Sequence, residues 1–451
     1  MAAPYARPMT DFHAAVERIM PSVRADLEDL VRIPSVSADP ARAADVRRSA
    51  EAVADLFRGV GIDDVRILAV DGGQPAVVAR RPAPPGQPTV LLYAHHDVQP
   101  TGDPALWDSP PFEPTERGER LYGRGAADDK AGVAAHLAAL RAHDGAPPVG
   151  VTVLIEGEEE VGSPTLEAFL EAHRDLLAAD VIVIADSSNW AIGEPALTTS
   201  LRGLVDCTVE VRTLDHAVHS GMAGGAAPDA LTVLCRLLAT LHDDAGDVAI
   251  EGLHSGPGPD LEYEESRFRA DAGVLDGVDL IGTGSLVERL WTKPCATVLA
   301  IDAPRVADVS NTLQPVARAK VSVRIAPGDD PDRALSALVR HLETHVEWGA
   351  EVTVSDVDRA APFAVDADGP VYDAARAAFA EAWGQDPVDM GIGGTIPFIA
   401  AFAEAYPKAA ILVTGVEDPD GRAHGANEGL HLAEFQKACV AEAILLANLA
   451  N

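Results

Sequence analysis

The sequence predicts an α/β fold with a mostly parallel central sheet, interrupted by a smaller α+β domain. Its 451 residues exceed the usual size of a single hydrophobic core, so two domains are expected. Between residues 89 and 185, continuous apolar strands alternate with amphipathic helices, the pattern of a parallel sheet covered by helices. From residue 202 the order becomes strand, helix, two strands, helix, strand, which is the split βαβ, ferredoxin-like arrangement.

The first part of the chain opens with two amphipathic helices. The first is expected to end at Ile33-Pro34 and the second near Gly61, because proline and glycine stop helices. Apolar runs on either side of a proline-rich turn then predict strands, and strands and helices alternate. The expected elements are helices 10–33 and 43–60, strands 64–70, 75–80 and 89–94, helix 129–143, strand 150–156, helix 163–177 and strand 180–185.

The second part begins near Arg202, where LVDCTVEVRT alternates apolar and polar residues as a half-buried strand does. After Pro362 the α/β pattern resumes. The expected elements are helix 226–243, strands 295–303 and 314–325, helix 330–345, strand 349–357, helices 370–384 and 395–406, strand 409–414 and helix 431–449. The predicted segments are therefore 1–201, an inserted domain 202–360, and 361–451.

Composition and charge restrict the class of protein. The residues are 47% hydrophobic and 23% charged, as in ordinary globular proteins, and the net charge is −35. Nucleic acids and anionic membranes bind basic surfaces, so this acidic chain is not expected to bind either.

The cysteine content and the hydropathy of the chain indicate its subcellular location. The four cysteines show no close-spaced pair, which favours reduced, buried thiols over a zinc knuckle or disulfides. The first 20 residues lack the apolar core of a signal peptide, and no apolar run is long enough to span a membrane. These features predict a cytoplasmic protein.

The first of three unusual clusters, YAHHDVQP, follows the apolar strand 89–94. His95 and Asp97 have H-x-D spacing, so both side chains lie on the same side of an extended chain. A metal-bound imidazole commonly donates its second N–H to a carboxylate. We expect His95 to be a ligand and Asp97 to orient it, whereas His96 points the opposite way and is structural. Surface turns also produce this spacing.

The second cluster, GRGAADDK, combines a glycine-rich turn with the start of a helix. Asp128 or Asp129 could bridge two cations with its two oxygens. The alternative is a helix N-cap with an acidic first turn.

The third cluster, EGEEEVGS, places three consecutive carboxylates after a buried strand. Their repulsion raises their pKa values unless cations or hydrogen bonds offset it. One carboxylate can coordinate an ion while its neighbour accepts a proton. A solvated acidic turn is the alternative, but it fits poorly with the preceding strand.

Two further candidates also follow predicted strands. Asp186 ends VIVIAD and is either a ligand or a turn residue, and His424 lies in the glycine-rich GRAHGANEG. The carboxyl ends of parallel strands form the ligand-binding edge of such sheets, so these side chains are expected to converge. Imidazoles and carboxylates together suit two Zn²⁺, Mn²⁺ or Co²⁺ ions, and a pair of such ions makes a hydrolase site.

With these motifs in order over nearly the whole chain, the sequence resembles the aminoacylase/carnosinase family of dinuclear metallopeptidases, most closely its cytosolic dipeptidase branch. The resemblance implies a zinc-peptidase-like catalytic domain formed by 1–201 and 361–451, with 202–360 as an inserted lid that dimerises. It implies two divalent ions per subunit, Zn²⁺ foremost and Mn²⁺ or Co²⁺ as alternatives.

The resemblance also implies roles for the residues of the three clusters. Asp128 corresponds to the bridging carboxylate. His95 and Asp186 complete one metal site, and Glu160 and His424 complete the other. Glu159 is similar to the general base that takes a proton from the attacking water and delivers it to the leaving amine, and Asp97 matches the orienting carboxylate.

The predicted lid carries further matches. In DHAVHSGMAGG, His219 matches a histidine that reaches the active site of the partner subunit and stabilises the oxyanion. Arg324 matches an arginine that binds the substrate carboxylate. Thr395 matches a hydroxyl residue near the substrate's C-terminal end, and Asn311 and Thr312 are expected to line the same pocket.

The resulting hypothesis is a cytoplasmic, homodimeric, metal-dependent dipeptidase that hydrolyses small unblocked dipeptides, with no nucleic acid or membrane partner. One alternative is an amidohydrolase of the same family that acts on N-acyl amino acids. Another is a non-catalytic metal or peptide binder, although Glu159 beside Glu160 argues against it.

Overall fold

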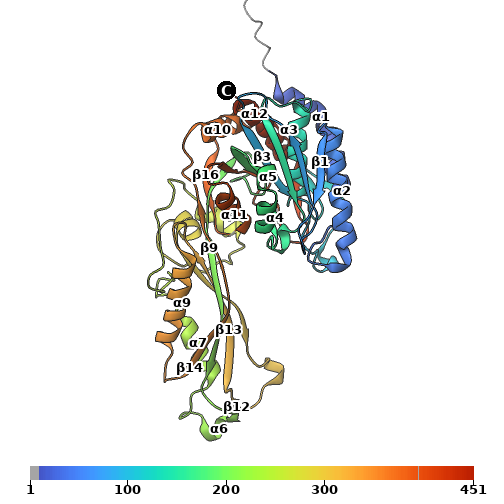
Figure 1. Cartoon of the computed structure of the whole chain (residues 1–451). Helices are drawn as coiled ribbons and strands as arrows, with labels where there is room; N and C mark the ends of the chain where they lie inside the picture. The colour runs from blue at the N-terminus through green and yellow to red at the C-terminus, as the bar shows by residue number, and fades with distance from the viewer. Residues whose placement is uncertain (1–9, 395, 451) are drawn as a thin grey trace, which may run out of the picture. The chain divides into compact units, whose positions relative to one another are not determined.

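The structure is a computed structural model that describes residues 10–394 and 396–450. The chain forms two compact units. Unit 1 comprises the described parts of 1–199, 366–390 and 401–451, and unit 2 comprises those of 200–365 and 391–400. Residues 391–400 thus group with unit 2, whereas the sequence placed them in the segment 361–451. Figure 1 shows the elements of both units.

The central sheet has the strand order β1-β2-β6-β3-β7-β17-β8-β15, and β16 also pairs with β8. Its four middle strands β6, β3, β7 and β17 are parallel to one another, while β1, β2, β8 and β15 join antiparallel at the two margins. The predicted mainly parallel sheet is confirmed. The strands are β1 (Asp64–Leu68), β2 (Ala76–Arg81), β3 (Thr89–His95), β6 (Gly150–Glu156), β7 (Val181–Ile184), β8 (Ala196–Leu201), β15 (Phe363–Ala364), β16 (Val388–Ile392) and β17 (Ala410–Val413).

Helices α1, α2 and α3 contact one another and lie side by side in Figure 1, and α12 packs on α1, α3 and α10. β3 and β6 are almost entirely buried, as expected for strands in the interior of a layered fold. The helices associated with this sheet are α1 (Phe12–Val31), α2 (Ala43–Gly59), α3 (Lys130–Ala142), α4 (Leu166–Ala172), α5 (Arg174–Leu177), α10 (Pro370–Trp383), α11 (Pro397–Ala405) and α12 (Leu432–Asn448), with short helices η1 (Pro40–Arg42), η2 (Pro104–Leu106) and η3 (Glu159–Val161).

The predicted helix 163–177 was wrong in detail. The structure has two short helices, and α4 begins only at Leu166. Pro164 disfavours helical geometry at Ser163, whose φ is +51°.

A small antiparallel sheet, which the sequence did not predict, bears directly on the site. Its order is β18 (Gly429–His431), β5 (Arg120–Tyr122) and β4 (Thr115–Arg117). Gly429 pairs with Tyr122, so the segment after β5 and the segment before β18 leave the sheet at the same point. These two segments carry Asp128 and His424.

Unit 2 contains a four-stranded antiparallel sheet in the order β11-β13-β9-β14. Numbered along the βαββαβ segment this is 2-3-1-4, which confirms the predicted ferredoxin-like domain. Val205, Cys207 and Val209 of β9 point to a core shared with α7 and α9. The elements are β9 (Gly203–Arg212), β10 (Val218–His219), α6 (Ser220–Ala223), α7 (Ala230–Ala239), α8 (Glu265–Asp271), η4 (Glu288–Thr292), β11 (Cys295–Asp302), η5 (Val306–Asp308), β12 (Thr312–Leu313), β13 (Val316–Ile325), α9 (Pro331–His345) and β14 (Glu351–Ala360).

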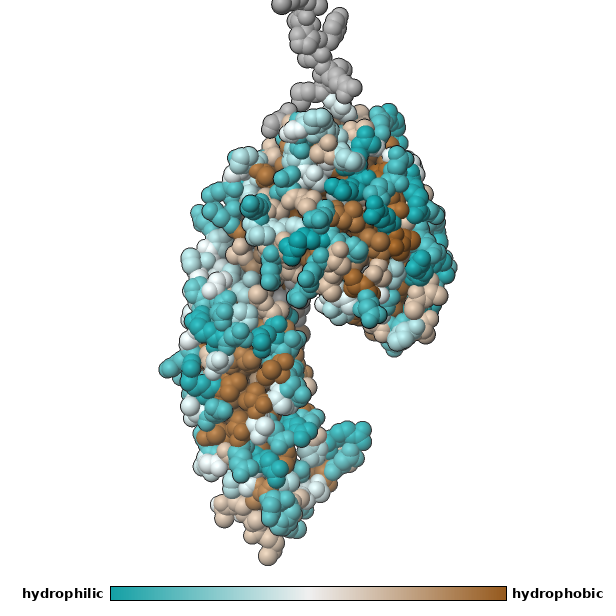
Figure 2. Space-filling model, in the orientation of Figure 1, coloured by the Kyte–Doolittle hydropathy of each residue, from teal (hydrophilic) through white to brown (hydrophobic). Residues whose placement is uncertain are grey.

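Hydropathy varies over the surface of the molecule. The face seen in Figure 2 is mostly hydrophilic, with some apolar patches. Within the described residues, none of the helices combines the length and apolarity needed to cross a membrane.

Candidate metal centre

The candidate site of unit 1 lies where the parallel strands end. His95 is the last residue of β3, Glu159 and Glu160 follow β6 in η3, and Asp186 follows β7. Register pairs His95 of β3 with Glu156 of β6, so the residues that follow these strands start from the same edge. His95 and Asp97 are fully buried.

Asp128 lies between two imidazoles. Its Oδ1 is 3.0 Å from Nε2 of His95, and its Oδ2 is 3.0 Å from Nε2 of His424. A carboxylate that presents one oxygen to each of two imidazoles has the arrangement of a bridging ligand. Of the two aspartates that the sequence offered for this position, the structure places Asp128 there.

Among the residues that the structure describes, two groups of ligand atoms are close enough to hold an ion. In each group the atoms lie within 4.8 Å of one another. The groups are His95, Glu159 and Asp186, and His95, Asp128 and Glu160. His424 adjoins the second group, because its Nε2 is 3.3 Å from Oε2 of Glu160. All five predicted ligands and Glu159 are therefore brought together.

The carboxylate of Glu159, the predicted general base, lies next to the predicted ligands. Its Oε2 is 3.9 Å from Nε2 of His95, and Oδ2 of Asp186 is 4.0 Å from the same nitrogen. The side chain of His424 is 60% exposed, so the centre is open on that side.

Asp97 connects two parts of the centre. Its carboxylate accepts the backbone N–H groups of Glu159 and Glu160 at 3.2 and 3.1 Å, and its Oδ1 is 3.4 Å from Nδ1 of His95. The backbone carbonyl of Asp97 is nearer to that nitrogen, at 3.0 Å. Both oxygens favour the tautomer with a proton on Nδ1, which leaves Nε2 free to bind an ion.

The electrostatics of the carboxylates provide a test of whether cations fit. Burial, followed by the charge of Asp186, raises the pKa of Glu159 well above its usual range. Burial and the charges of Asp128 and Glu160 raise the pKa of Asp186 to about 7. Carboxylates that disfavour one another's ionised form in this way are stabilised by divalent cations.

The pKa values of the two imidazoles are raised as well, but for an imidazole a raised pKa favours the charged form. Burial alone would lower the pKa of His95, but hydrogen bonds with Asp128 and Asp97 raise it well above its usual value. Hydrogen bonds to Asp128 and Glu160 raise the pKa of His424 to about 11. The same bonds from His424 and His95 hold the pKa of Asp128 below its usual range despite burial. The donor set, N and O ligands around a shared carboxylate, fits a pair of divalent ions.

Three supporting residues lie inside the motif strings, and sequence reasoning left Asp129 as a bridge or an N-cap and did not assign Gln99 or Glu428. Asp129 accepts the N–H of His95 at 3.1 Å and also caps α3 through Gly132, so the N-cap interpretation holds for this residue. Gln99 donates from its backbone and side chain to Glu160. Glu428 accepts the N–H of Asp128 at 3.1 Å.

His96 was predicted to be structural, and its contacts agree. Its Nε2 is 2.8 Å from the carbonyl oxygen of Pro75, and burial lowers its pKa to about 4. It contributes to neither group of ligand atoms.

The predicted substrate residues of unit 2 fall into two places. His219 pairs with Thr312 across β10 and β12, and the N–H of Ser220 donates to the carbonyl of Asn311. Arg324 lies near the other end of β13, paired with Leu204. Thr395 lies outside the described residues.

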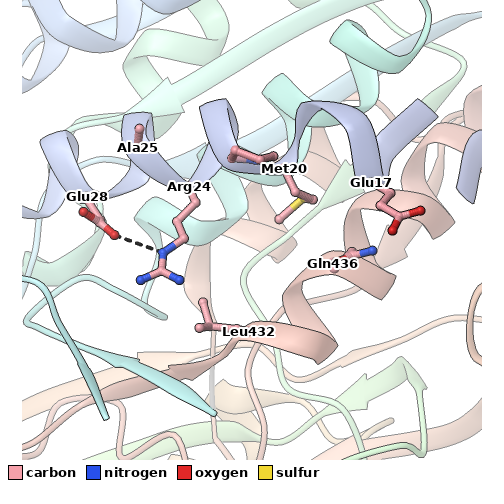
Figure 3. A pocket seen from close by; sticks show the side chains of 8 residues that line it. Glu17, Met20, Arg24, Ala25, Glu28, Leu432 and Gln436 are labelled. Carbon is pink, nitrogen blue, oxygen red and sulfur yellow. Dashed lines mark hydrogen bonds and ion pairs between the residues drawn. The ribbon is translucent and has the colours of Figure 1, made fainter. Parts of the chain in front are cut away.

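A groove elsewhere in unit 1 holds none of the predicted site residues. It has a volume of about 510 Å³ between α1 and the start of α12 (Figure 3). Met20, Arg24 and Leu432 line it, and Arg24 forms an ion pair with Glu28, one turn further along α1.

Comparison with known proteins bears on this centre. Residues 91–448 match the model of peptidase family M20/M25/M40. The chain is 35% identical over 428 residues to cysteinylglycine-S-conjugate dipeptidase of Corynebacterium striatum, which covers 93% of this chain and 94% of the relative. It is similar to the crystal structure of human carnosine dipeptidase 1, with a TM-score of 0.81 and 26% identity over 99% of this chain and 100% of that one.

The dipeptidase Dug1p of Saccharomyces cerevisiae shares the fold, with a TM-score of 0.78 and 22% identity over 97% of this chain and 98% of that one. The predicted kinship with the metallopeptidases and the prediction of an enzyme are confirmed. The chain therefore belongs to peptidase family M20/M25/M40.

Proposed function

We propose that this protein is a metal-dependent dipeptidase that hydrolyses the peptide bond of small unblocked dipeptides. The observation that carries the proposal is the carboxylate of Asp128 between His95 and His424, with Glu159 and Glu160 beside it. The relatives described above are dipeptidases by name, and they match along nearly the whole chain.

The proposed ligands are His95, Asp128 and Asp186 for one ion and Asp128, Glu160 and His424 for the other. Zn²⁺ is the proposed metal, with Mn²⁺ or Co²⁺ as substitutes. Two such ions would lower the pKa of a water molecule and polarise the scissile carbonyl.

In this proposal the chain's own groups handle the proton. Glu159 accepts it from the attacking water and delivers it to the leaving amine, for which its raised pKa is suited. Asp97 positions Glu159 through the backbone N–H at 3.2 Å while it keeps His95 in the required tautomer.

His219 is proposed to stabilise the oxyanion. Its Nδ1 accepts the N–H of Gly221 at 3.0 Å, so the neutral ring carries its proton on Nε2 and can donate it. Arg324 is proposed to bind the terminal carboxylate of the substrate, with Thr395 in the same pocket. Asn311 and Thr312 lie beside His219, so in this proposal they reach that pocket from a partner subunit together with His219.

The distance between His219 and Arg324 within one unit 2 supports a homodimer. Their places are separated by most of the ten-residue strand β13, which corresponds to roughly 27 Å. A dipeptide spans only about 7 Å. One unit 2 therefore cannot bring both residues to the same dipeptide, and we propose that His219 serves the site of a partner subunit.

The edge strand β11 is the proposed dimer contact. Leu299 on it is 60% exposed, and an uncovered edge strand with apolar side chains favours association. The cytoplasmic location also remains a proposal, supported by four cysteines that are all free thiols.

The proposal is tested by a substrate panel. Metal-depleted protein is assayed before and after addition of Zn²⁺ or Mn²⁺, with an S-substituted cysteinylglycine, a β-alanyl dipeptide, Ala-Ala and N-acetyl-alanine. Metal-dependent cleavage of dipeptides but not of N-acetyl-alanine is expected. Preference for N-acetyl-alanine would favour the amidohydrolase alternative, and no turnover would favour the binder.

A further inference from the structure

A buried ion pair lies beside the candidate centre but contributes no ligand to it. Nη1 of Arg124 is 2.6 Å from Oε2 of Glu428, and the two side chains are 1% and 0% exposed. Burying two charges is costly unless further hydrogen bonds satisfy both groups. The remaining contacts of this pair therefore indicate what it holds in place.

Glu428 holds the segment that carries Asp128. Its Oε2 accepts the N–H of Gly125 at 2.9 Å, and its Oε1 accepts those of Ala127 and Asp128 at 2.8 and 3.1 Å. One carboxylate thus accepts three backbone N–H groups in addition to the guanidinium of Arg124. The position of Asp128 depends on these bonds.

Arg124 holds the segment that carries His424. Its Nη2 donates to the carbonyl of Gly425 at 3.0 Å, directly after His424, and to that of Pro100 at 3.4 Å. The His424 segment needs such support, because His424 has a φ of +63° and Asn427 one of +61°, conformations that side-chain-bearing residues rarely adopt.

We propose that Arg124 and Glu428 form a positioning pair that sets the distance between Asp128 and His424. The pair would therefore control the ion held by Asp128, Glu160 and His424 more than the ion held by His95, Asp128 and Asp186. This selectivity follows from the contacts. Both proposed ions share Asp128, but only the first uses His424, whose segment Arg124 holds, and neither His95 nor Asp186 is hydrogen-bonded to a member of the pair. The inference rests on the proposed two-ion centre.

The test uses two variants and a matched control in the full chain. Arg124→Lys keeps the charge opposite Glu428 but cannot donate in the same fork to Gly425. Glu428→Gln removes the charge and half of the acceptor capacity. Glu442→Gln is the control, because Glu442 is also a buried carboxylate, hydrogen-bonded to His136 at 2.8 Å, and belongs to neither group of ligand atoms.

Each metal-depleted protein is titrated with Co²⁺ alone, and calorimetry and the visible absorption spectrum report stoichiometry and coordination. The wild type and the control are expected to bind two ions. In Arg124→Lys and Glu428→Gln one ion should keep its affinity within a few-fold, and the other should weaken about 10- to 100-fold with an altered spectrum.

The outcomes separate this inference from the proposed function. A wild type that binds fewer than two ions would overturn the two-ion centre and the inference together. Two ions in the wild type, with affinities unchanged or equally reduced at both sites in the variants, would overturn the positioning pair alone. If Glu428→Gln does not fold, Arg124→Lys decides the question by itself.

Discussion

The carboxylate of Asp97 accepts the backbone N–H of Glu160 at 3.1 Å, so the residue that orients His95 also fixes the turn that supplies the acidic ligands. Because β3 and β6 are neighbouring parallel strands, this one side chain spans the gap between their ends. The ligand and base positions are thus coupled through Asp97.

Replacing Asp97 should therefore disturb both the orientation of His95 and the position of the Glu159–Glu160 turn. In Asp97→Asn the amide NH₂ faces backbone N–H donors, so we expect metal affinity to fall about 10- to 100-fold and turnover to fall at limiting metal. Zn²⁺ titration of chelator-treated protein measures this. Asp103→Asn, which changes an exposed cap of η2, is the control, and wild-type affinity in Asp97→Asn would contradict the coupling.

Glu159→Gln should separate metal binding from chemistry. The amide cannot accept a proton, so kcat should fall by about two to four orders of magnitude while the metal content stays at the wild-type level. Glu158→Gln is the neighbouring control, because Glu158 binds the N–H groups of Gln74 and Thr165 and contributes to neither group of ligand atoms. Normal turnover in Glu159→Gln would exclude it as the base.

Metal binding should release protons. The pKa of His424 is about 11, so its imidazole is protonated at neutral pH before an ion displaces the proton, and the pKa of His95 is shifted in the same direction. Affinity should therefore weaken as the pH falls. Calorimetry of Mn²⁺ binding at pH 7 in buffers with different ionisation enthalpies measures the proton count, and identical heats in all buffers would contradict this assignment.

His219 should act in trans. His219→Ala is expected to lower kcat with little change in the unfolding temperature, because His219 is exposed and its side chain only caps the four-residue helix α6 through the N–H of Gly221. Mixing His219→Ala with Glu159→Gln should form hybrid dimers that contain one intact site and recover part of the activity. Dimers that exchange subunits yet show no recovery would argue for a site completed within one chain.

His96 should make the protein sensitive to acid. Its pKa is about 4 in the fold and about 6.5 when unfolded, so between these values the unfolded chain binds a proton that the fold excludes. The free energy of unfolding should fall as the pH drops through this window, by up to about 3 kcal/mol. His96→Gln, which can still donate to Pro75, should show a shallower slope in chemical unfolding of metal-free protein, and an unchanged slope would assign the sensitivity to other groups.

Much of the architecture could be predicted because its signals are local. The apolar runs before His95 and Asp186 mark buried parallel strands, and their carboxyl ends must meet at one edge of the sheet. The same reasoning identified the ferredoxin-like domain from the order of its elements. Local signals also have limits. The apolar pattern of a helix extends back to residue 163, and it hid the effect of Pro164, which delays the start of α4 to Leu166.

Only the tertiary structure distinguished residues that the sequence left equivalent. Asp128 and Asp129 are adjacent and chemically identical, yet one lies between two imidazoles and the other caps α3. The difference depends on the pairing of β5 with β18, residues about 300 positions apart, and on Glu428, which receives the N–H of Asp128 across that distance. Hydrogen bonds between segments so far apart in the chain leave no repeating pattern in the sequence. The sequence alone therefore determined which side chains could form the site, and only the tertiary structure decided which of their atoms come together.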